Sequence, residues 1–324
     1  MGARVLRIVG YIVAGVLGLI VVVIGIAELR WDRTYTAPAT HVVASRDSAV
    51  IARGRYLVYG PAHCVGCHMS PSDTTLVKAG QEVPLAGGGP FRIPLGTFYA
   101  RNLTPDSATG IGTRTDEELA RMIRYNIRWD GRATVPFMEF QDVSDDDLTA
   151  LISFLRSQAP VHNQAPSRTL NVMGKVIMAF VLKPLAPKEQ PPARTPAPET
   201  AAYGAYMANA VAQCGDCHTN RSMRDGSFIG PRYAGGWVFP LESDPTMELV
   251  TPNLTPDSAT GRIAQWSEDR FVARLHAGAA IPQSIMPWTE FGRMTDTDLR
   301  AIYRFLRTLP PVRNETGPSL RKRT

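Results

Sequence analysis

The sequence contains few cysteines: there are four in 324 residues, Cys64, Cys67, Cys214 and Cys217. They fall as two close pairs, so none is left over for a long-range disulfide bond. A framework of such disulfides is therefore excluded. In an oxidising compartment, each close pair has to be occupied by something that consumes its thiols.

The chain also lacks a large charge of one sign outside its two ends. The formal net charge is +6, and most of it comes from Arg4, Arg7 and the basic residues 321–323. No basic stripe interleaved with aromatic residues lies between them, so we expect no nucleic-acid binding. No sustained alternation of apolar and polar residues is present either, and the sequence therefore predicts an all-α fold.

A long apolar run lies near the N-terminus. Residues 8–27 are twenty consecutive residues without a charge, and as a helix they would just span the hydrocarbon core of a bilayer. Arg4 and Arg7 precede the run, so we expect its N-terminal end to stay cytoplasmic and the rest to be exported. A cleaved signal peptide is the alternative, but its apolar region is about 7–15 residues long and this run is longer. We therefore expect residues 1–30 to form a retained transmembrane anchor.

Most of the chain occurs twice. Residues 102–110 recur letter for letter as residues 253–261. The period is far too long for a solenoid and indicates a duplicated domain. Further matches are Gly54 with Gly204, Tyr56 with Tyr206, Glu139-Phe140 with Glu290-Phe291, Leu148 with Leu299, and residues 154–156 with 305–307.

The repeat defines the expected domain organisation. We predict a first domain over residues 45–163, a second over residues 199–314 and a basic tail over residues 315–324. Residues 164–198 join the two domains as an amphipathic helix followed by a proline-rich linker. Six prolines lie in residues 183–198, a composition typical of a semi-rigid extended spacer.

The helix expected within the joining segment covers residues 172–182. This stretch is too short to span a membrane and contains Lys175. Its apolar residues recur at helical spacing, which predicts an amphipathic helix. Packing against one of the two domains is the favoured interpretation, and contact with the membrane surface or a partner protein is the alternative.

Both repeats carry helix start signals at corresponding places. Thr115, with a glutamate three residues later, predicts a capping box, and the counterpart helix should begin near Ser267. The last helix of each repeat should begin at Ser144 and at Thr295. The first repeat also has a turn-rich segment around residues 84–96 that is long for a compact domain. We expect this segment to pack against a large apolar cofactor.

The two cysteine pairs each end in histidine. The motifs are Cys64-Val-Gly-Cys67-His68 and Cys214-Gly-Asp-Cys217-His218. Two thiols three residues apart can bond to the two vinyl groups of one haem, and the adjoining histidine can ligate its iron. Zinc uses the same ligand types, but the pairs lie far apart in sequence, each in its own domain. A thioredoxin-like pair would need a βαβ setting. The motifs therefore predict two covalently bound haem c groups, with His68 and His218 as axial ligands.

The second axial ligand should lie in the loop before the last helix of each repeat. In the second repeat this loop contains Met286, which we expect to ligate the iron; Met294 competes but is explained as an apolar contact at the helix start. In the first repeat Val135 occupies the position of Met286, and Met138 is the methionine of the loop. We therefore expect Met138 to be the ligand there. The remaining alternatives are His41, His63, His162 and His276.

Together these residues resemble a known family. Both repeats resemble class I cytochrome c domains, and their tandem arrangement is similar to the membrane-bound cytochrome c subunits of bacterial alcohol and aldehyde dehydrogenases. The resemblance covers about residues 45–315 and rests on the two CxxCH motifs, the repeated Asn-Leu-Thr-Pro-Asp, Met286-Pro-Trp and the Phe-Leu-Arg of the last helices. It implies that the first helix of each domain crosses the last at Gly54 and Gly204. Those subunits usually carry three haem motifs, whereas this chain has two.

Histidine–methionine ligation leaves no open position for substrate chemistry. We therefore expect an electron carrier and not an enzyme. Such a protein would pass electrons between a membrane or periplasmic dehydrogenase, or a quinol-oxidising complex, and a terminal acceptor. We expect it in a bacterial inner membrane with both haem domains in the periplasm. A di-haem cytochrome c peroxidase is the alternative, and it would need one haem with a vacant or labile sixth site.

Overall fold

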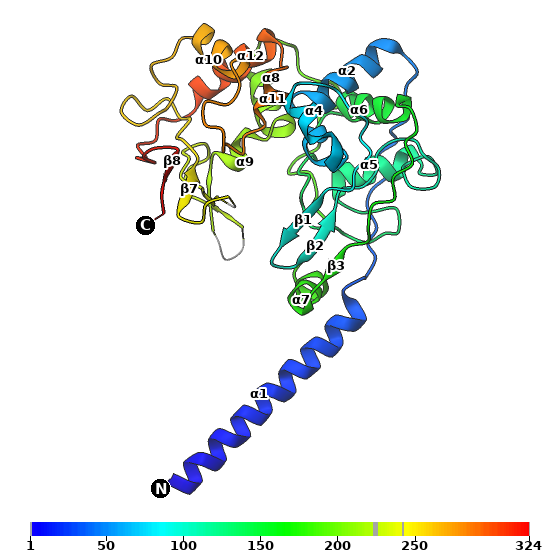
Figure 1. The fold of residues 1–324 in the computed structure, drawn as a ribbon, viewed down its shortest axis with the longest axis vertical. Coiled ribbons are helices and arrows are strands. Elements are labelled where there is room, and N and C mark those ends of the chain that lie inside the picture. Colours follow the sequence, from blue (N-terminus) through cyan, green and yellow to red (C-terminus); the bar gives the residue numbers. More distant parts are fainter. Residues whose placement is uncertain (1, 223–225, 242, 324) are drawn as a thin grey trace.

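The computed structural model of the chain describes residues 2–222, 226–241 and 243–323. Figure 1 shows a long N-terminal helix, α1 (Gly2–Arg30), that projects from a body of two lobes. The first repeat forms one lobe and the second repeat forms the other. Of the expected all-α fold, the mainly helical character and the N-terminal apolar helix are thus confirmed.

Helix α1 carries the apolar run. Its length and composition are sufficient to cross a membrane, and within the described part of the chain it is the one helix of this kind. Apart from Ala27, its residues are exposed or half-buried. For most of its length, the apolar surface of α1 is thus not covered by the rest of the described chain.

The first lobe is built from α2 and α6, which cross each other. Its helices are α2 (Ser48–Tyr59), α3 (Cys64–His68), α4 (Thr74–Lys78), α5 (Asp116–Tyr125), α6 (Asp145–Ser157) and α7 (Val172–Phe180), with a short 3₁₀ turn, η1 (Pro71–Asp73). The crossing is close because Gly54 has no side chain: a Cβ there would overlap the carbonyl group of Ala150. The contact expected at Gly54 is therefore confirmed.

The second lobe repeats this plan. Its helices are α8 (Ala201–Tyr206), α9 (Cys214–Cys217), α10 (Glu268–His276), α11 (Trp288–Phe291) and α12 (Asp296–Thr308), and α8 continues into a π-helical turn, η2 (Met207–Val211). Helix α8 crosses α12 as α2 crosses α6. Gly204 permits this approach, since a Cβ there would overlap the carbonyl of Ala301.

The helix starts lie where the sequence places them. Ser144, Thr295 and Ser267 each accept a hydrogen bond from a backbone N–H in the first turn of their helix. Thr115 forms both halves of a capping box with Glu118. These local predictions are confirmed.

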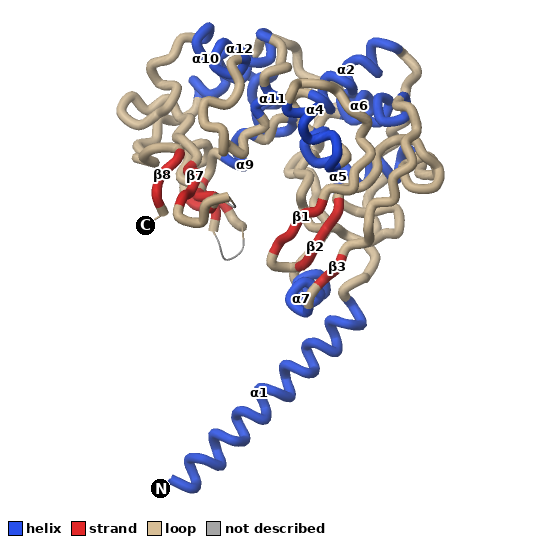
Figure 2. Tube along the Cα trace, in the orientation of Figure 1, coloured by secondary structure: helices blue, strands red, loops and turns tan. Residues whose placement is uncertain are grey.

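The fold is not all-α, because short antiparallel sheets accompany the helices (Figure 2). The strands are β1 (Pro90–Ile93), β2 (Gly96–Tyr99), β3 (Thr169–Leu170), β4 (Asn220–Arg221), β5 (Phe228–Ile229), β6 (Val238–Pro240), β7 (Met247–Val250) and β8 (Leu320–Lys322). They form the sheets β1-β2-β3, β4-β5 and β6-β7-β8. Strands this short show no readable alternation, which is why the sequence pattern missed them.

The outer strands of two sheets come from segments expected to lie outside the domains. Strand β3, from the joining segment, pairs with β2 of the first lobe. Strand β8, from the basic tail, pairs with β7 of the second lobe. Each repeat thus closes its sheet with chain that follows its last helix.

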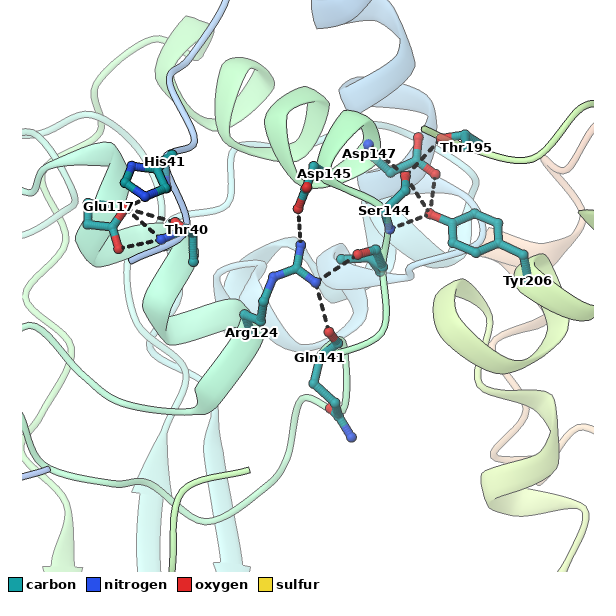
Figure 3. Close-up of polar contacts among 11 residues, drawn as sticks. Thr40, His41, Glu117, Arg124, Gln141, Ser144, Asp145, Asp147, Thr195 and Tyr206 are labelled. Atoms are coloured by element: carbon teal, nitrogen blue, oxygen red, sulfur yellow. Dashed lines mark hydrogen bonds and ion pairs between the residues drawn. The ribbon is translucent and has the colours of Figure 1, made fainter. Parts of the chain in front are cut away.

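The two lobes meet through a polar contact that also occurs twice. Tyr206 of the second lobe donates its hydroxyl hydrogen to Asp147 of the first at 2.6 Å and accepts the backbone N–H of Ser144 at 3.1 Å (Figure 3). In the reciprocal contact, Tyr56 of the first lobe donates to Asp298 and accepts the backbone N–H of Thr295. The tyrosines are counterparts in the repeat, so the lobes are related by an approximate two-fold axis.

The proline-rich linker runs across the start of α6. The backbone N–H groups of Asp145 and Asp146 donate to the carbonyls of Pro192 and Ala193 at 3.0 and 3.1 Å. Thr195 hydrogen-bonds Ser144 at 2.9 Å (Figure 3). The linker is therefore docked on the first lobe and satisfies N–H groups that the helix itself leaves free.

Candidate haem-binding sites

The two CxxCH motifs fold into the same tight helical turn. Helices α3 and α9 each begin directly after a residue in the left-handed conformation, His63 with φ 40° and Gln213 with φ 52°. The first cysteine of each motif is half-buried and the second is exposed. All four thiols are free of disulfides. Each turn therefore presents two thiols to one site.

The histidines of both motifs are oriented alike. His68 Nδ1 lies 2.8 Å from the carbonyl oxygen of Arg101, and His218 Nδ1 lies 3.1 Å from that of Pro252. A carbonyl cannot donate a hydrogen, so Nδ1 carries the proton and Nε2 keeps its lone pair. Burial lowers the pKa of both histidines, which keeps them neutral. A neutral imidazole with a free, oriented Nε2 is the form that ligates a metal.

The thiols are not activated nucleophiles. Burial raises the pKa of Cys64 and of Cys214 to about 12 in each case. Reactive cysteines usually have the opposite shift. Among the described residues, no group of three or more His, Cys, Asp and Glu side chains is placed to hold a metal ion. The arrangement favours covalent attachment of an organic group over either alternative chemistry.

A cavity of about 380 Å³ in the second lobe collects the predicted site residues. Cys214, Cys217, His218 and Met286 all line it. Its size falls in the range of about 300–1,000 Å³ that is usual for cofactor pockets. The rest of its lining is largely apolar, and includes Leu249, Ile263, Trp266, Phe271 and Leu275. Thiols, imidazole and thioether around one apolar cavity fit a c-type haem.

Met294 lines the same cavity. It is buried in the core directly before α12, as is Leu299 one turn into that helix. Met286 instead lies in the irregular loop before α11 and is half-buried. Trp288 beside it is fixed by a 2.9 Å hydrogen bond from Nε1 to Ser284 and by the guanidinium of Arg274, 4.2 Å from its ring centre.

Met138 lies in the corresponding loop of the first lobe and packs against the core. The side-chain amide of Asn126 donates to the Met138 carbonyl at 3.1 Å. Phe137 next to it lies against Phe91 and Phe98 of the β1–β2 hairpin, with ring centres 5.6 and 5.4 Å apart. The loop is therefore held at Phe137 and at the carbonyl of Met138.

Arginines gather beside Arg101, whose backbone carbonyl accepts the hydrogen bond of His68. Arg101, Arg128, Arg132 and Arg168 lie close enough to repel one another, with Asp130 among them. Burial, and then Arg128, lower the pKa of Arg168 to about 10. In the repeat, Arg101 and Arg128 correspond to Pro252 and Ala279. The cavity of the second site has Arg262 and Arg274 in its lining.

The first attachment turn lies against the second lobe. His63, from the first lobe, lines the cavity of the second, and its ring meets that of Phe291 edge-on with centres 5.7 Å apart. Glu290 is buried beside the first turn, 3.7 Å from where a Cβ of Gly66 would lie. This contact is not apparent from the sequence. Its one local signal is the position of His63 directly before Cys64.

The repeated Asn-Leu-Thr segments have a structural role. Asn102 and Asn253 are buried, and their amides donate at 2.8 Å to the carbonyls of Val161 and Val312. Each tethers the chain that follows the last helix of its repeat. The other expected alternatives to methionine lie elsewhere: His162 faces Asp106 at 3.7 Å, His276 hydrogen-bonds Asp296, and His41 is exposed.

The chain is homologous to cytochrome c subunits of dehydrogenases and to a di-haem cytochrome c. It is 31% identical over 285 residues to the cytochrome c subunit of alcohol dehydrogenase (quinone) from Gluconobacter oxydans, covering 82% of this chain and 56% of that subunit. It is 28% identical over 291 residues to the cytochrome c subunit of gluconate 2-dehydrogenase from Pantoea cypripedii, covering 81% of this chain and 60% of that subunit. It is 25% identical over 276 residues to a di-haem c-type cytochrome from Cereibacter sphaeroides, covering 79% and 84%. The chain thus spans little more than half the length of the dehydrogenase subunits, and no family model matches it.

Proposed function

We propose that the chain is a membrane-anchored di-haem c-type cytochrome that carries electrons. Residues 45–163 and 199–314 would be two class I cytochrome c domains, each with one covalently bound haem c. Cys64, Cys67, Cys214 and Cys217 would attach the haems, and His68 and His218 would ligate the irons. The anchor would be residues 1–30, the joining segment residues 164–198 and the tail residues 315–324.

The sixth ligands would be Met286 and Met138. Met286 supports this role by lining the same cavity as His218 from a separate loop. Met138 supports it by its place in the matching loop, which Asn126 and Phe137 hold in position. Bound iron would supply one-electron chemistry between its ferric and ferrous states, and thioether ligation favours the ferrous state. The chain attaches, ligates and encloses the group.

The observation that carries the proposal is the reach of His63 into the second cavity. His63 is covalently adjacent to Cys64, so the attachment point of one haem touches the pocket of the other. Haems held at these two sites would act as one electron-transfer unit. The direct contact across the lobes supports a carrier that accepts an electron at one haem and releases it from the other.

The relatives suggest the setting. Their names place them as cytochrome subunits of dehydrogenases that act on alcohol or gluconate. We propose that this chain likewise accepts electrons from a dehydrogenase, or from a quinol-oxidising complex, and passes them to a terminal acceptor. With α1 in a bacterial inner membrane, both lobes would lie in the periplasm.

Haem content tests the proposal directly. A pyridine haemochrome assay on the purified protein should give two haems per chain. Replacing Cys214 and Cys217 by Ala should leave one, and the matched change at Cys64 and Cys67 should leave the other. A ratio near one in the unaltered protein, or a mass without haem adducts, would overturn the assignment.

Spin state separates electron transfer from the peroxidase alternative. Both haems of the unaltered protein should be low-spin and unreactive towards CO, because both iron faces are ligated. A high-spin, CO-binding haem would favour a peroxidase. Copurification from solubilised membranes, followed by identification of the proteins that come along, would then name the redox partner.

A further inference from the structure

Apart from Lys175, helix α7 is apolar on all sides, but the protein covers only part of it. Lys175 is its one charged residue. Gly174, Met178 and Ala179 are buried. The opposite face of the helix is formed by Val172, Met173, Val176, Ile177 and Phe180. Within that face the exposed fractions are 53% for Val172, 58% for Met173 and 43% for Phe180. A surface helix normally carries polar residues there.

Helix α7 is tied to the end of α1. Lys175 forms an ion pair with Glu28 at 2.7 Å. At the other end of α7, the carbonyl of Leu182 accepts hydrogen bonds from Arg33 at 3.1 Å and from Tyr35 at 3.0 Å. Helix α7 and the residues that follow it are therefore held by chain that lies within a few residues of the end of α1.

The same helix is fixed to the first lobe. The side chain of Asn171 donates to the carbonyl of Pro94 at 2.8 Å, in the turn between β1 and β2. Gly174 packs so closely on Leu95 that a Cβ would overlap the Leu95 carbonyl. Helix α7 thus connects α1 rigidly to the haem-binding lobe.

The position of α7 relative to the bilayer follows from which residues of α1 it covers. Helix α1 packs against α7, and its covered residues are Val23, Ile24 and Ala27. These lie in the last turn and a half of the apolar run 8–27, which as a helix is about 30 Å long. If the run spans the hydrocarbon core, α7 lies at the boundary between hydrocarbon and headgroups. Figures 1 and 2 show α1 along its length and α7 nearly end-on, so α7 runs across α1.

We propose that α7 is an interfacial helix, embedded in the outer surface of the bilayer that α1 crosses. Val172, Met173 and Phe180 contact the acyl chains, and the lipid covers the face that the protein leaves open. Arg33 and Lys183 lie in the chain beside it and would attract anionic headgroups. The proposal rests on the proposed membrane anchor and adds to it: two contacts, α1 and α7, fix which way the haem domains face.

Spin labels on the full-length, haem-loaded protein test the depth of α7 in the bilayer. Leu17→Cys, Met173→Cys and Ala52→Cys would be labelled separately in vesicles of phosphatidylcholine with a minority of phosphatidylglycerol. Ala52 is exposed on α2, in the part of the first lobe away from α1 (Figure 1). Comparing accessibility to oxygen with that to a water-soluble nickel chelate should place Leu17 deep, Met173 at the interface and Ala52 in water.

The labels distinguish two kinds of failure. A Met173 label as accessible to the nickel chelate as the Ala52 label, with Leu17 deep, would overturn the role of α7 and leave the anchor intact. A Leu17 label in water, or lost by cleavage, would overturn the anchor and the interfacial helix together. A Met173 label in vesicles that is inaccessible to both oxygen and the nickel chelate would show protein contact in place of lipid, and would also overturn the proposal.

A second experiment tests whether α7 fixes the orientation of the haem domains on the membrane. The double variant Met173→Ser, Phe180→Ser should remain in the membrane through α1 and keep both haems, but lose its fixed orientation. Linear dichroism of the haem bands in aligned bilayers should fall at least twofold. Val43→Ser, at an exposed apolar residue outside α7, is the matched control and should leave it unchanged. Unchanged dichroism in the double variant would contradict the proposal.

Discussion

Tyr206 of the second lobe donates a hydrogen bond to the buried carboxylate of Asp147 in the first lobe, across 2.6 Å. The same carboxylate forms an ion pair with Arg53 of its own lobe at 2.8 Å. Asp147 is thus shared between the core of one lobe and the interface with the other. Its counterpart, Asp298, accepts hydrogen bonds from two tyrosines, Tyr56 and Tyr203.

This difference predicts that two matched substitutions lower the free energy of unfolding by unequal amounts. Tyr206→Phe leaves Asp147 its ion pair with Arg53, whereas Tyr56→Phe leaves Asp298 with one neutral donor. Losing a hydrogen bond to a buried charged group costs about 1–3 kcal/mol. We expect Tyr56→Phe to lower the free energy of unfolding by the upper end of that range and Tyr206→Phe by the lower end. Denaturant unfolding of the haem-loaded protein measures both, and the reverse order would contradict this account.

The methionine assignment predicts where each haem opens to external ligands. Met286→Ala should make the C-terminal haem high-spin and reactive to CO, and Met138→Ala should do the same at the N-terminal haem. Met294→Leu is the control, since an apolar core residue can be replaced by one of similar volume with little effect. Absorbance spectra with and without CO distinguish the variants. A CO-reactive haem in Met294→Leu, with none in Met286→Ala, would move the ligand to Met294.

The arginine cluster predicts a shift in redox potential. Arg168 interacts with Arg101, whose carbonyl accepts the hydrogen bond of His68. Arg168→Gln removes a positive charge from this cluster, so the potential of a haem ligated by His68 should fall. For charges about 10 Å apart at an effective dielectric constant of about 20, the effect is on the order of 1–2 kcal/mol, or several tens of millivolts. Stability should change little, because relief of the repulsion by Arg128 and Arg132 is offset by loss of the attraction to Asp130 and of the contact with the Trp31 ring.

Spectroelectrochemical titration of the two haems checks this shift. Arg313→Gln removes an exposed arginine from the second lobe and is the charge-matched control. An equal shift of both haems in both variants would indicate a general charge effect and not a local one.

A histidine joins the end of α10 to the start of α12 and predicts a pH dependence. Nε2 of His276 hydrogen-bonds Asp296 at 2.9 Å, and Nδ1 hydrogen-bonds the carbonyl of Gly292 at 2.9 Å. The Asp296 contact, followed by the Gly292 contact, raises the pKa of His276 above its usual 6.5. Folding therefore favours the protonated form. This contribution to stability is complete below the ordinary pKa and is lost as pH rises through the raised one.

We therefore expect His276→Gln to flatten the decline in stability from neutral to mildly alkaline pH. Denaturant midpoints across that range measure it. His41→Gln, at an exposed histidine of the first lobe, should retain the decline. If His276→Gln and the unaltered protein decline in parallel, another group causes the pH dependence.

The parts of the fold that depend on neighbours in sequence could be predicted. The caps at Ser144 and Thr295 are right because a hydroxyl that bonds the third residue of a helix is a local feature. The strands were missed because β3 and β8 are two and three residues long and are defined by distant partners. The pairing of Tyr56 with Asp298 could not be foreseen, since it exists only once the lobes have docked.

The candidate haem-binding sites likewise combine features that the sequence predicts with features that it does not. The attachment turns follow from four cysteines and two histidines in fixed spacing, which the sequence displays directly. The placement of His63 in the opposite cavity depends on the angle between the lobes. The arginine cluster gathers residues from separated segments, among them Arg101 and Arg168. Residues from separated segments form no periodic pattern in the sequence, so this cluster could not be predicted.

The reciprocal tyrosine contact has a consequence for how such a chain arises. Each lobe offers the other the same patch, a tyrosine and the start of a helix, so the patch is complementary to a copy of itself. A single-domain ancestor with this patch would already form a homodimer. Joining two copies by a docked linker turns that encounter into an intramolecular one, at an effective concentration in the millimolar range for short tethers. The two halves are then free to diverge, and the arginines of one lobe and the exposed Ala279 that replaces one of them in the other are differences a symmetric dimer could not hold.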